Sequence, residues 1–179
     1  MALSPEEKSK RRRERMIQKA KEYTPTTYIR KFVAPEFQRM IRAEYGARTT
    51  GFTTAVKNGQ IVEVLRMLGE CVCVTCGTVY PWSGERYGGA LDTGHFIGSR
   101  RNAILFEEDN VAPQCVSCNR YHGGRPSEYR VWMECVYGIE TIERLERLRN
   151  ETRRFTREEL VEMRITHKNR LDTAIERMG

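Results

Sequence analysis

The sequence lacks any run of apolar residues that approaches the roughly 20 needed to span a membrane. Its charged N-terminal stretch, MALSPEEKSKRRR, has no apolar segment of the kind that a secretory signal peptide carries. No internal repeat is evident either. These absences argue against a membrane protein and a repeat array, and we expect a cytoplasmic protein with no membrane partner.

Acidic residues are the minority among the charged side chains. The 179-residue chain has 24 Asp and Glu against 31 Lys and Arg, which gives a formal net charge of +7 at pH 7. Such a balance favours polyanionic partners such as nucleic acid, although charge by itself does not identify one. A hydrophobic content of 39% allows a modest core, and the length fits one domain, or one domain with an appendage.

Five of the six cysteines lie within residues 71–122. In a reducing compartment such a cluster indicates a metal site rather than disulfides, and Zn²⁺ is the usual occupant of paired C-x2-C motifs. Cys71 lies too close to the first motif to form another knuckle and, like Cys135, remains unassigned. The sequence therefore predicts a structural zinc held by Cys73, Cys76, Cys115 and Cys118.

A second set of polar residues lies between and just after the cysteine pairs, which are farther apart than the roughly 15–20 residues usual for zinc knuckles. A histidine can take a proton from water, and a hard cation with oxygen ligands can stabilise a pentavalent phosphate and its leaving oxygen. The set therefore suits phosphodiester hydrolysis; the alternative is a zinc module in which it only satisfies local hydrogen bonds. Its members are Asp92, His95, Asn110, Asn119 and His122.

The order of these motifs resembles that of the HNH, or ββα-metal, nucleases. D-T-G-H ends at His95, Asn110 follows, and C-x-x-C-N ends at Asn119, where many members have a histidine, so this is an H-N-N variant. Gly94 rather than an aspartate directly precedes His95. More narrowly, the chain is similar over residues 70–178 to the phage lambda Rap/NinG recombination proteins, through C-x-x-C-G-T, D-x-G-H, F-x-E-x-N, Q-C-V-x-C-N and Y-R-V.

The resemblance implies an α+β fold, in which a mostly helical chain surrounds a small zinc-stabilised ββα-metal core. It also implies a phage-encoded recombination endonuclease in the bacterial cytoplasm, which cuts branched DNA (D-loops, Holliday junctions) and leaves 5′-phosphate and 3′-hydroxyl ends. We assign His95 as general base, Asp92 and Asn119 as ligands of a catalytic Mg²⁺ or Mn²⁺, and Asn110 as the residue that fixes the loop and orients His95. His122 is a third metal ligand, a phosphate donor or a surface residue.

Basic side chains on two segments are candidates for DNA contacts. Residues 4–22 are predicted to form a helix that Ser4 and Glu7 start through a capping box. Its basic run is either an arm along DNA phosphates or a solvated helix or disordered tail. The guanidinium groups in the loop after His95 are either phosphate clamps or ordinary surface charge. The candidates are Arg11, Arg12, Arg13, Arg15, Arg100 and Arg101.

Hydrophobic periodicity and turn residues predict the other elements. We expect helices over 35–45, 59–68, 127–137, 139–149 and 157–178, a loop over 47–58, a hairpin around 79–95, and a strand over 111–114 that leads into a helix near Cys118. In the last helix, His167 lies in the apolar stripe and is expected to be structural. Four regions follow: a basic arm (1–33), a helical segment (34–69), the zinc-bound nuclease core (70–125) and the C-terminal helices (126–179).

Two other functions fit the same residues. A non-catalytic, zinc-containing DNA-binding recombination mediator would keep the zinc and the basic helix without metal-dependent cutting. An HNH nuclease of linear duplex would differ only in substrate. Resolution of a four-way junction favours a two-fold homodimer, for which the C-terminal helices could supply the interface.

Overall fold

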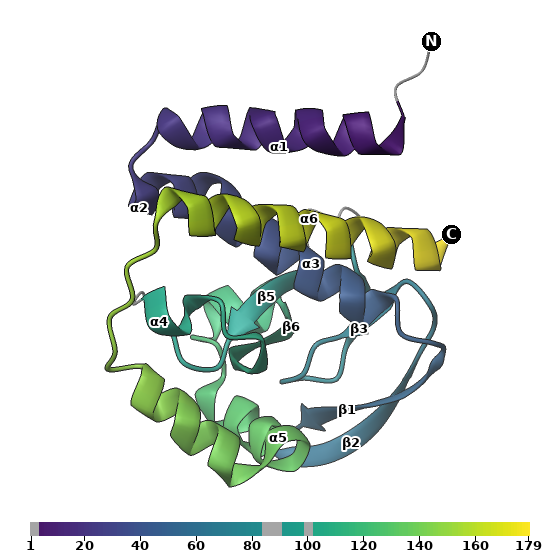
Figure 1. Cartoon of the computed structure of the whole chain (residues 1–179). Helices are drawn as coiled ribbons and strands as arrows, with labels where there is room; N and C mark the ends of the chain where they lie inside the picture. Colours follow the sequence, from purple (N-terminus) through teal and green to yellow (C-terminus); the bar gives the residue numbers. More distant parts are fainter. Residues whose placement is uncertain (1–3, 84–90, 99–101) are drawn as a thin grey trace.

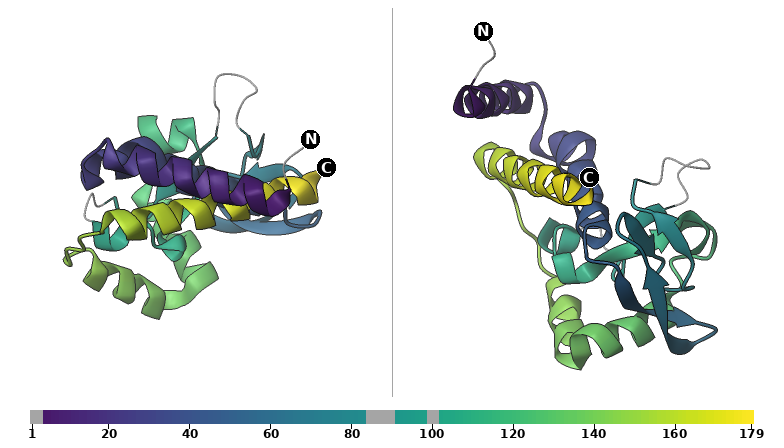
Figure 2. Two further views of the ribbon diagram at one scale, coloured as in Figure 1. Left: turned by 45° about the horizontal axis from the view of Figure 1, so that its top comes forward. Right: turned by 90° about the vertical axis from the view of Figure 1, so that its right-hand side faces the viewer.

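The computed structural model of the chain describes residues 4–83, 91–98 and 102–179. Within them, long helices combine with three two-stranded antiparallel sheets, so the fold is α+β as predicted. Three helical layers lie on one side of the molecule, and the sheets and one long helix lie on the other (Figures 1 and 2). No helix among the described residues is long and apolar enough to cross a membrane.

The first helix, α1 (Pro5–Lys21), begins at the predicted capping box of Ser4 and Glu7. It lies antiparallel to the last helix, α6 (Arg157–Met178) (Figure 2). This helix begins at a second capping box, formed by Thr156 and Glu159. Met16 and Ala20 of α1 are buried in a cluster that also contains Leu160. The N-terminal helix is therefore packed against the C-terminal helix.

One continuous helical segment follows, made of α2 (Pro25–Tyr28), the π-helical turn η1 (Ile29–Val33) and α3 (Ala34–Gly46). It runs across the predicted boundary at residue 33. Its apolar face packs against α6, and His167 is buried there beside Phe37, with ring centroids 5.1 Å apart. The prediction that His167 is structural is confirmed.

The predictions of a loop over 47–58 and a helix over 59–68 are wrong. These residues form a hairpin of β1 (Gly51–Lys57) and β2 (Gln60–Arg66), joined by Asn58 and Gly59. Both turn residues have positive φ, 53° and 77°, as a type I′ turn requires. The helix-like spacing of apolar residues in β2 was misleading, because the hairpin docks on the rest of the chain: Trp132 donates a hydrogen bond from Nε1 to the carbonyl oxygen of Thr54, at 2.9 Å.

The predicted hairpin around 79–95 is also wrong in its pairing. β4 (Val79–Pro81) pairs with β3 (Glu70–Val72), whereas β5 (Leu91–His95) pairs with β6 (Val111–Cys115). Part of the predicted hairpin, residues 84–90, lies outside the described residues. The strand predicted over 111–114 is confirmed as β6.

Short helical elements surround the β5–β6 pair. Along the chain, α4 (Asn102–Leu105) and the 3-10 turn η2 (Glu108–Asn110) come between β5 and β6, and the π-helical turn η3 (Ser117–Tyr121) follows β6. The long helix α5 (Pro126–Leu148) is interrupted at Gly138, with φ 77°, where the sequence predicted a stop between two helices. Its buried residues Met133, Ile142 and Leu145 form the core beneath the sheets.

Candidate functional site

Four cysteines from distant parts of the chain meet between β3 and η3. The Sγ atoms of Cys73, Cys76, Cys115 and Cys118 all lie within 4.8 Å of one another. Both pairs have turn geometry. The N–H of Gly77, which has φ 74°, donates to the carbonyl oxygen of Cys73 at 2.9 Å, and the N–H of Cys118 donates to Sγ of Cys115 at 3.4 Å. The predicted zinc ligands therefore converge.

The donor set fits a tetrahedral metal ion. Zn–S bonds of about 2.3 Å place neighbouring sulfurs about 3.8 Å apart, and Sγ of Cys76 lies 3.9 Å from Sγ of Cys115. Hydrogen bonding from Cys73 lowers the pKa of Cys76, which favours the thiolate that a metal ligand needs. Cys71 is different, because burial raises its pKa to about 12 and its thiol donates to the carbonyl oxygen of Arg42 at 3.2 Å. Four cysteines can thus hold a metal, and structural zinc is compatible with them.

Strand β5 carries the predicted base at its C-terminal end. Alternation along the strand places Asp92 and Gly94 on one face and Thr93 and His95 on the other. Nε2 of His95 lies 3.4 Å from the carbonyl oxygen of Leu105, and burial lowers the pKa of the imidazole. His95 is therefore neutral at pH 7, the state that a proton acceptor needs.

Asp92 and Asn119, the two predicted Mg²⁺ ligands, are in direct contact. Nδ2 of Asn119 donates to the Asp92 carboxylate at 3.0 Å, and Arg120 donates to both carboxylate oxygens, at 2.7 and 2.8 Å. Burial opposes ionisation of Asp92, but the hydrogen bonds from Arg120 and Asn119 outweigh it and lower the pKa of the carboxyl group. Asp92 is thus an anion paired with Arg120, a partner that no motif in the sequence indicated.

Asn110 is fully buried and holds the segment that follows His95. Its side chain accepts from the N–H of Ile97 at 2.8 Å and donates to the carbonyl oxygen of Ile97 at 3.2 Å, and its backbone carbonyl accepts from the N–H of Phe96 at 2.8 Å. The contacts of Asn110 are therefore with the backbone directly after His95. The candidate third ligand, His122, contacts Ser117: Nδ1 of His122 lies 2.9 Å from the carbonyl oxygen of Ser117.

The glycine before His95 has a packing reason. A Cβ at Gly94 would lie 2.2 Å from Oε1 of Gln114, a fully buried side chain on β6. Nε2 of Gln114 donates to Oγ1 of Thr75 at 2.9 Å and to the carbonyl oxygen of Gly124 at 2.7 Å. Gln114 therefore joins the first cysteine turn to the segment after the second, and it occupies the space that an aspartate at position 94 would need.

A cleft of about 1010 Å³ opens over the His95 face of β5. His95, Thr93 and Asn119 line it, and Asp92 does not. The opposite wall comes from the N-terminal helical segment, which contributes Arg30 and other residues. Sequence reasoning missed this wall, because nothing in the motifs connects residues near position 30 with His95.

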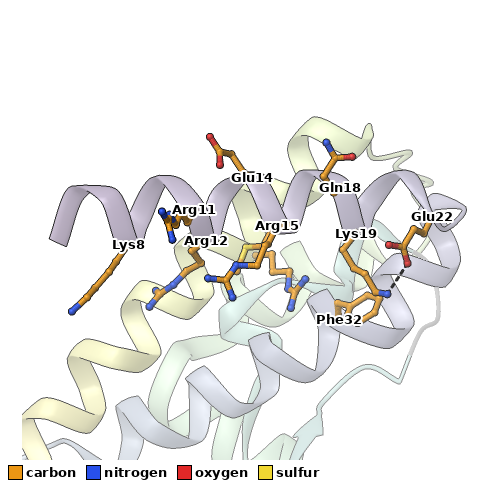
Figure 3. Close-up of a pocket in the computed structure, with 11 residues that line it drawn as sticks. Lys8, Arg11, Arg12, Glu14, Arg15, Gln18, Lys19, Glu22 and Phe32 are labelled. Atoms are coloured by element: carbon orange, nitrogen blue, oxygen red, sulfur yellow. Dashed lines mark hydrogen bonds and ion pairs between the residues drawn. The ribbon is translucent and has the colours of Figure 1, made fainter. Parts of the chain in front are cut away.

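The predicted DNA-binding arginines on α1 differ in their contacts. Arg12 pairs with Asp172 at 3.1 Å and Arg13 pairs with Glu162, so these two attach α1 to α6. Arg11, Arg12 and Arg15 line a groove of about 1430 Å³. In Figure 3, the side chains of Lys8, Arg12, Arg15 and Lys19 extend to one side of α1, and those of Glu14 and Gln18 extend to the opposite side. Arg100 and Arg101 lie outside the described residues.

Comparison with protein-family models gives a match to the Bacteriophage Lambda NinG protein family over residues 56–176, more than half of the chain. The chain belongs to the NinG family. Membership points to a phage protein related to recombination. The match begins within β1, so the NinG region includes part of the hairpin that sequence reading missed, and it excludes α1, α2, η1 and α3. Comparisons with curated proteins and with solved structures give no significant match.

Proposed function

We propose that this NinG-family protein is a metal-dependent DNA endonuclease that acts on branched DNA, such as D-loops and Holliday junctions, in phage recombination. The observation that carries the proposal is the position of Asn119, which lines the cleft together with His95, donates a hydrogen bond to Asp92 and directly follows Cys118 of the four-cysteine site. The order of the three residues follows the HNH pattern, and the recombination-related family supports DNA as substrate. Products with 5′-phosphate and 3′-hydroxyl ends are part of the proposal.

In this mechanism the neutral imidazole of His95 accepts a proton from the attacking water. Asp92 supplies a carboxylate oxygen, and Asn119 supplies its carbonyl oxygen, because its amide nitrogen is bonded to Asp92. Mg²⁺ or Mn²⁺ bound there would polarise the phosphate and stabilise the leaving oxygen. Asn110 holds the backbone after His95 and so limits movement of the base. A cation held by Asp92 would compete with Arg120 for the carboxylate oxygens.

One observation favours the rival function of a non-catalytic DNA-binding recombination mediator. Both oxygens of Asp92 are engaged by Arg120, and one of them also accepts from Asn119, an arrangement that is satisfied without a catalytic metal. In a mediator these contacts would be structural. An HNH nuclease acting on linear duplex would share the mechanism proposed above and differ in substrate preference.

The first experiment measures Mg²⁺-dependent cleavage of a labelled four-way junction beside a linear duplex of matched sequence. Wild type is compared with His95→Ala, with zinc content and circular dichroism confirming that both are folded. Cleavage that disappears in the variant supports the enzyme and its base, and the junction-to-duplex ratio tests the branched substrate. Binding without cleavage in either Mg²⁺ or Mn²⁺ would favour the mediator.

Two further measurements separate the roles at the site. If His95 is the base, kcat/KM rises with pH and levels off, with an apparent pKa below the usual 6.5 of histidine, because burial lowers it. His122→Ala resolves the role of that residue. A higher Mg²⁺ requirement would identify a third ligand, weaker DNA binding with unchanged metal dependence would identify a phosphate contact, and unchanged cleavage and binding would identify a surface residue.

The groove along α1 is the second proposed DNA contact. A double variant, Arg11→Ala with Arg15→Ala, should bind the junction more weakly than wild type, and its affinity should depend less on salt concentration. Arg13→Ala provides a comparison on the same helix, because Arg13 is already paired with Glu162. A two-fold dimer on the four-way junction remains part of the proposal, and a monomeric mass at working concentration, with and without DNA, would count against it.

A further inference from the structure

The cleft over His95 has two walls that are tied together. Gln38 of α3 accepts a hydrogen bond at its carbonyl oxygen from Oγ1 of Thr93 on β5, at 2.8 Å, and Arg42 of α3 donates to the same hydroxyl at 3.1 Å. The helical wall therefore has a defined position relative to the strand that carries His95. Its residues belong to the site, although they precede the segment that matches the NinG family.

The charges of this cleft favour an anion. Of the described residues that line it, Arg30 and His95 alone can ionise, and no carboxylate lines it. His95 is neutral near pH 7, so Arg30 supplies the positive charge. A cleft whose described lining residues include one guanidinium and no acid attracts phosphate, and a guanidinium can bind two phosphate oxygens at once.

Arg30 is available for such a contact. Its side chain is exposed, and within the described part of the chain it makes no ion pair or hydrogen bond. The basic residues around it are already engaged. Nζ of Lys31 lies 4.8 Å from the ring centroid of Tyr23, and the guanidinium carbon of Arg39 lies 5.9 Å from that of Trp82. Among the described residues, Arg30 thus differs from Lys31 and Arg39 in having no side-chain partner.

The local backbone explains how Arg30 comes to face the cleft. It lies in the π-helical turn η1, where an extra residue per turn shifts the side chains relative to a regular helix. Ile29 and Val33 of the same turn are buried, which anchors the turn. Such turns are frequent at functional sites.

We propose that Arg30 binds a phosphate of the DNA backbone in the His95 cleft and holds the strand beside the base. This inference rests on the proposed function, because it names the residue through which the same cleft would hold its substrate. It also gives the N-terminal helical segment a part in the site.

Binding is measured first, by fluorescence anisotropy of labelled junction and duplex over a range of salt concentrations without added divalent metal. Arg30→Ala should weaken binding about 5- to 20-fold at low salt and reduce the slope of log K against log[salt] by about one, as expected for one lost phosphate contact. Arg30→Lys should recover part of the affinity. Lys31→Ala is the matched control from the same turn, and both its affinity and its slope should equal those of wild type.

Cleavage then separates this inference from the proposed function. If wild type cuts DNA, Arg30→Ala should lower kcat/KM about 10- to 100-fold, as expected for the loss of a hydrogen bond to a charged group, with zinc content and melting temperature unchanged. If Arg30→Ala binds and cuts DNA as well as wild type does, the proposed role of Arg30 is overturned and the proposed nuclease function is unaffected. If wild type binds DNA but does not cut it, and Arg30→Ala binds more weakly than wild type, the phosphate contact is supported and the nuclease function is overturned. If wild type binds neither the junction nor the duplex, both the phosphate contact of Arg30 and the proposed nuclease function are overturned.

Discussion

Arg120 binds both carboxylate oxygens of Asp92, although Asp92 is the acidic ligand proposed for the catalytic metal. Arg120 is largely exposed and the Asp92 carboxylate is mostly covered, with exposed side-chain fractions of 64% and 18%. The pair can therefore open toward solvent from the arginine side. Its state should govern how readily the site accepts a cation.

Removing Arg120 tests this relationship. Arg120→Ala frees the Asp92 oxygens, so the Mg²⁺ concentration that gives half-maximal cleavage should fall by about two- to fivefold, because solvent screens a pair with one exposed partner and limits its strength. Mg²⁺ titrations of cleavage measure the effect. Arg130→Ala is the control, since Arg130 pairs with Glu134 and Glu146 on α5. An unchanged or higher Mg²⁺ requirement in Arg120→Ala would show that Arg120 does not compete with the metal.

The cysteine site should be required for folding. Cys115→Ser or Cys118→Ser removes a ligand from a site that joins the turn after β3 to the start of η3, so bound zinc and the cooperative unfolding transition should be lost together. Elemental analysis and thermal melting measure the two effects. Cys135→Ser should retain about one zinc per chain, because Cys135 is exposed and is not one of the clustered cysteines. A folded, zinc-free Cys115→Ser protein would contradict a structural role.

His167 should make the fold sensitive to mild acid. Burial is the main cause that lowers its pKa to about 4, and the nearby Arg170 adds to the effect. The unfolded chain binds a proton near pH 6.5 and the folded chain does not, so stability falls as pH drops below 6.5. One such group contributes about 1.4 kcal/mol of loss by pH 5.5.

Urea unfolding at pH 7.0 and 5.5 measures this loss. His167→Gln, which cannot titrate, should lose less stability than wild type over the same interval, and the difference isolates His167 from the other groups that titrate. Equal losses in the two proteins would assign the acid sensitivity elsewhere, with His95 as the next candidate, because burial lowers its pKa as well.

Gly94 should tolerate no side chain while Gln114 is present. Gly94→Ala places a Cβ against the buried Gln114 and should cost about 1–3 kcal/mol of folding free energy, typical of overpacking. Gln114→Ala should also destabilise, because it breaks the bonds to Thr75 and Gly124. In the double variant the clash is gone, so urea unfolding should give less than the sum of the two losses. Additive losses would show that the two positions do not interact.

Features set by short-range chemistry were predictable from the sequence. Ser4 with Glu7 and Thr156 with Glu159 start their helices as capping boxes, because the required donors and acceptors are three residues apart. The two C-x2-C pairs are equally local, since a single turn places both sulfurs on one side. The apolar face of α3 and the stop at Gly138 follow from periodicity and from the conformational freedom of glycine.

The β1–β2 hairpin shows where such reasoning failed. Ile61, Val64, Leu65 and Leu68 have helical spacing, but Asn58-Gly59 offered a type I′ turn, and the β-branched residues before and after it favour strands. Long-range contacts stabilise the strand arrangement, in which Trp132 of α5 donates a hydrogen bond to the Thr54 carbonyl oxygen.

The candidate site divides in the same way. The sequence by itself determined which residues are candidates for chemistry, namely the clustered cysteines and the Asp92, His95 and Asn119 set, because residue type and spacing along the chain express ligand chemistry. Only the tertiary structure decided that Arg120 holds Asp92, that Gln114 excludes a side chain at Gly94, and that Arg30 shares a cleft with His95. Each of these relationships joins segments at least 20 residues apart in the chain, so it depends on how helices and strands pack rather than on any local pattern.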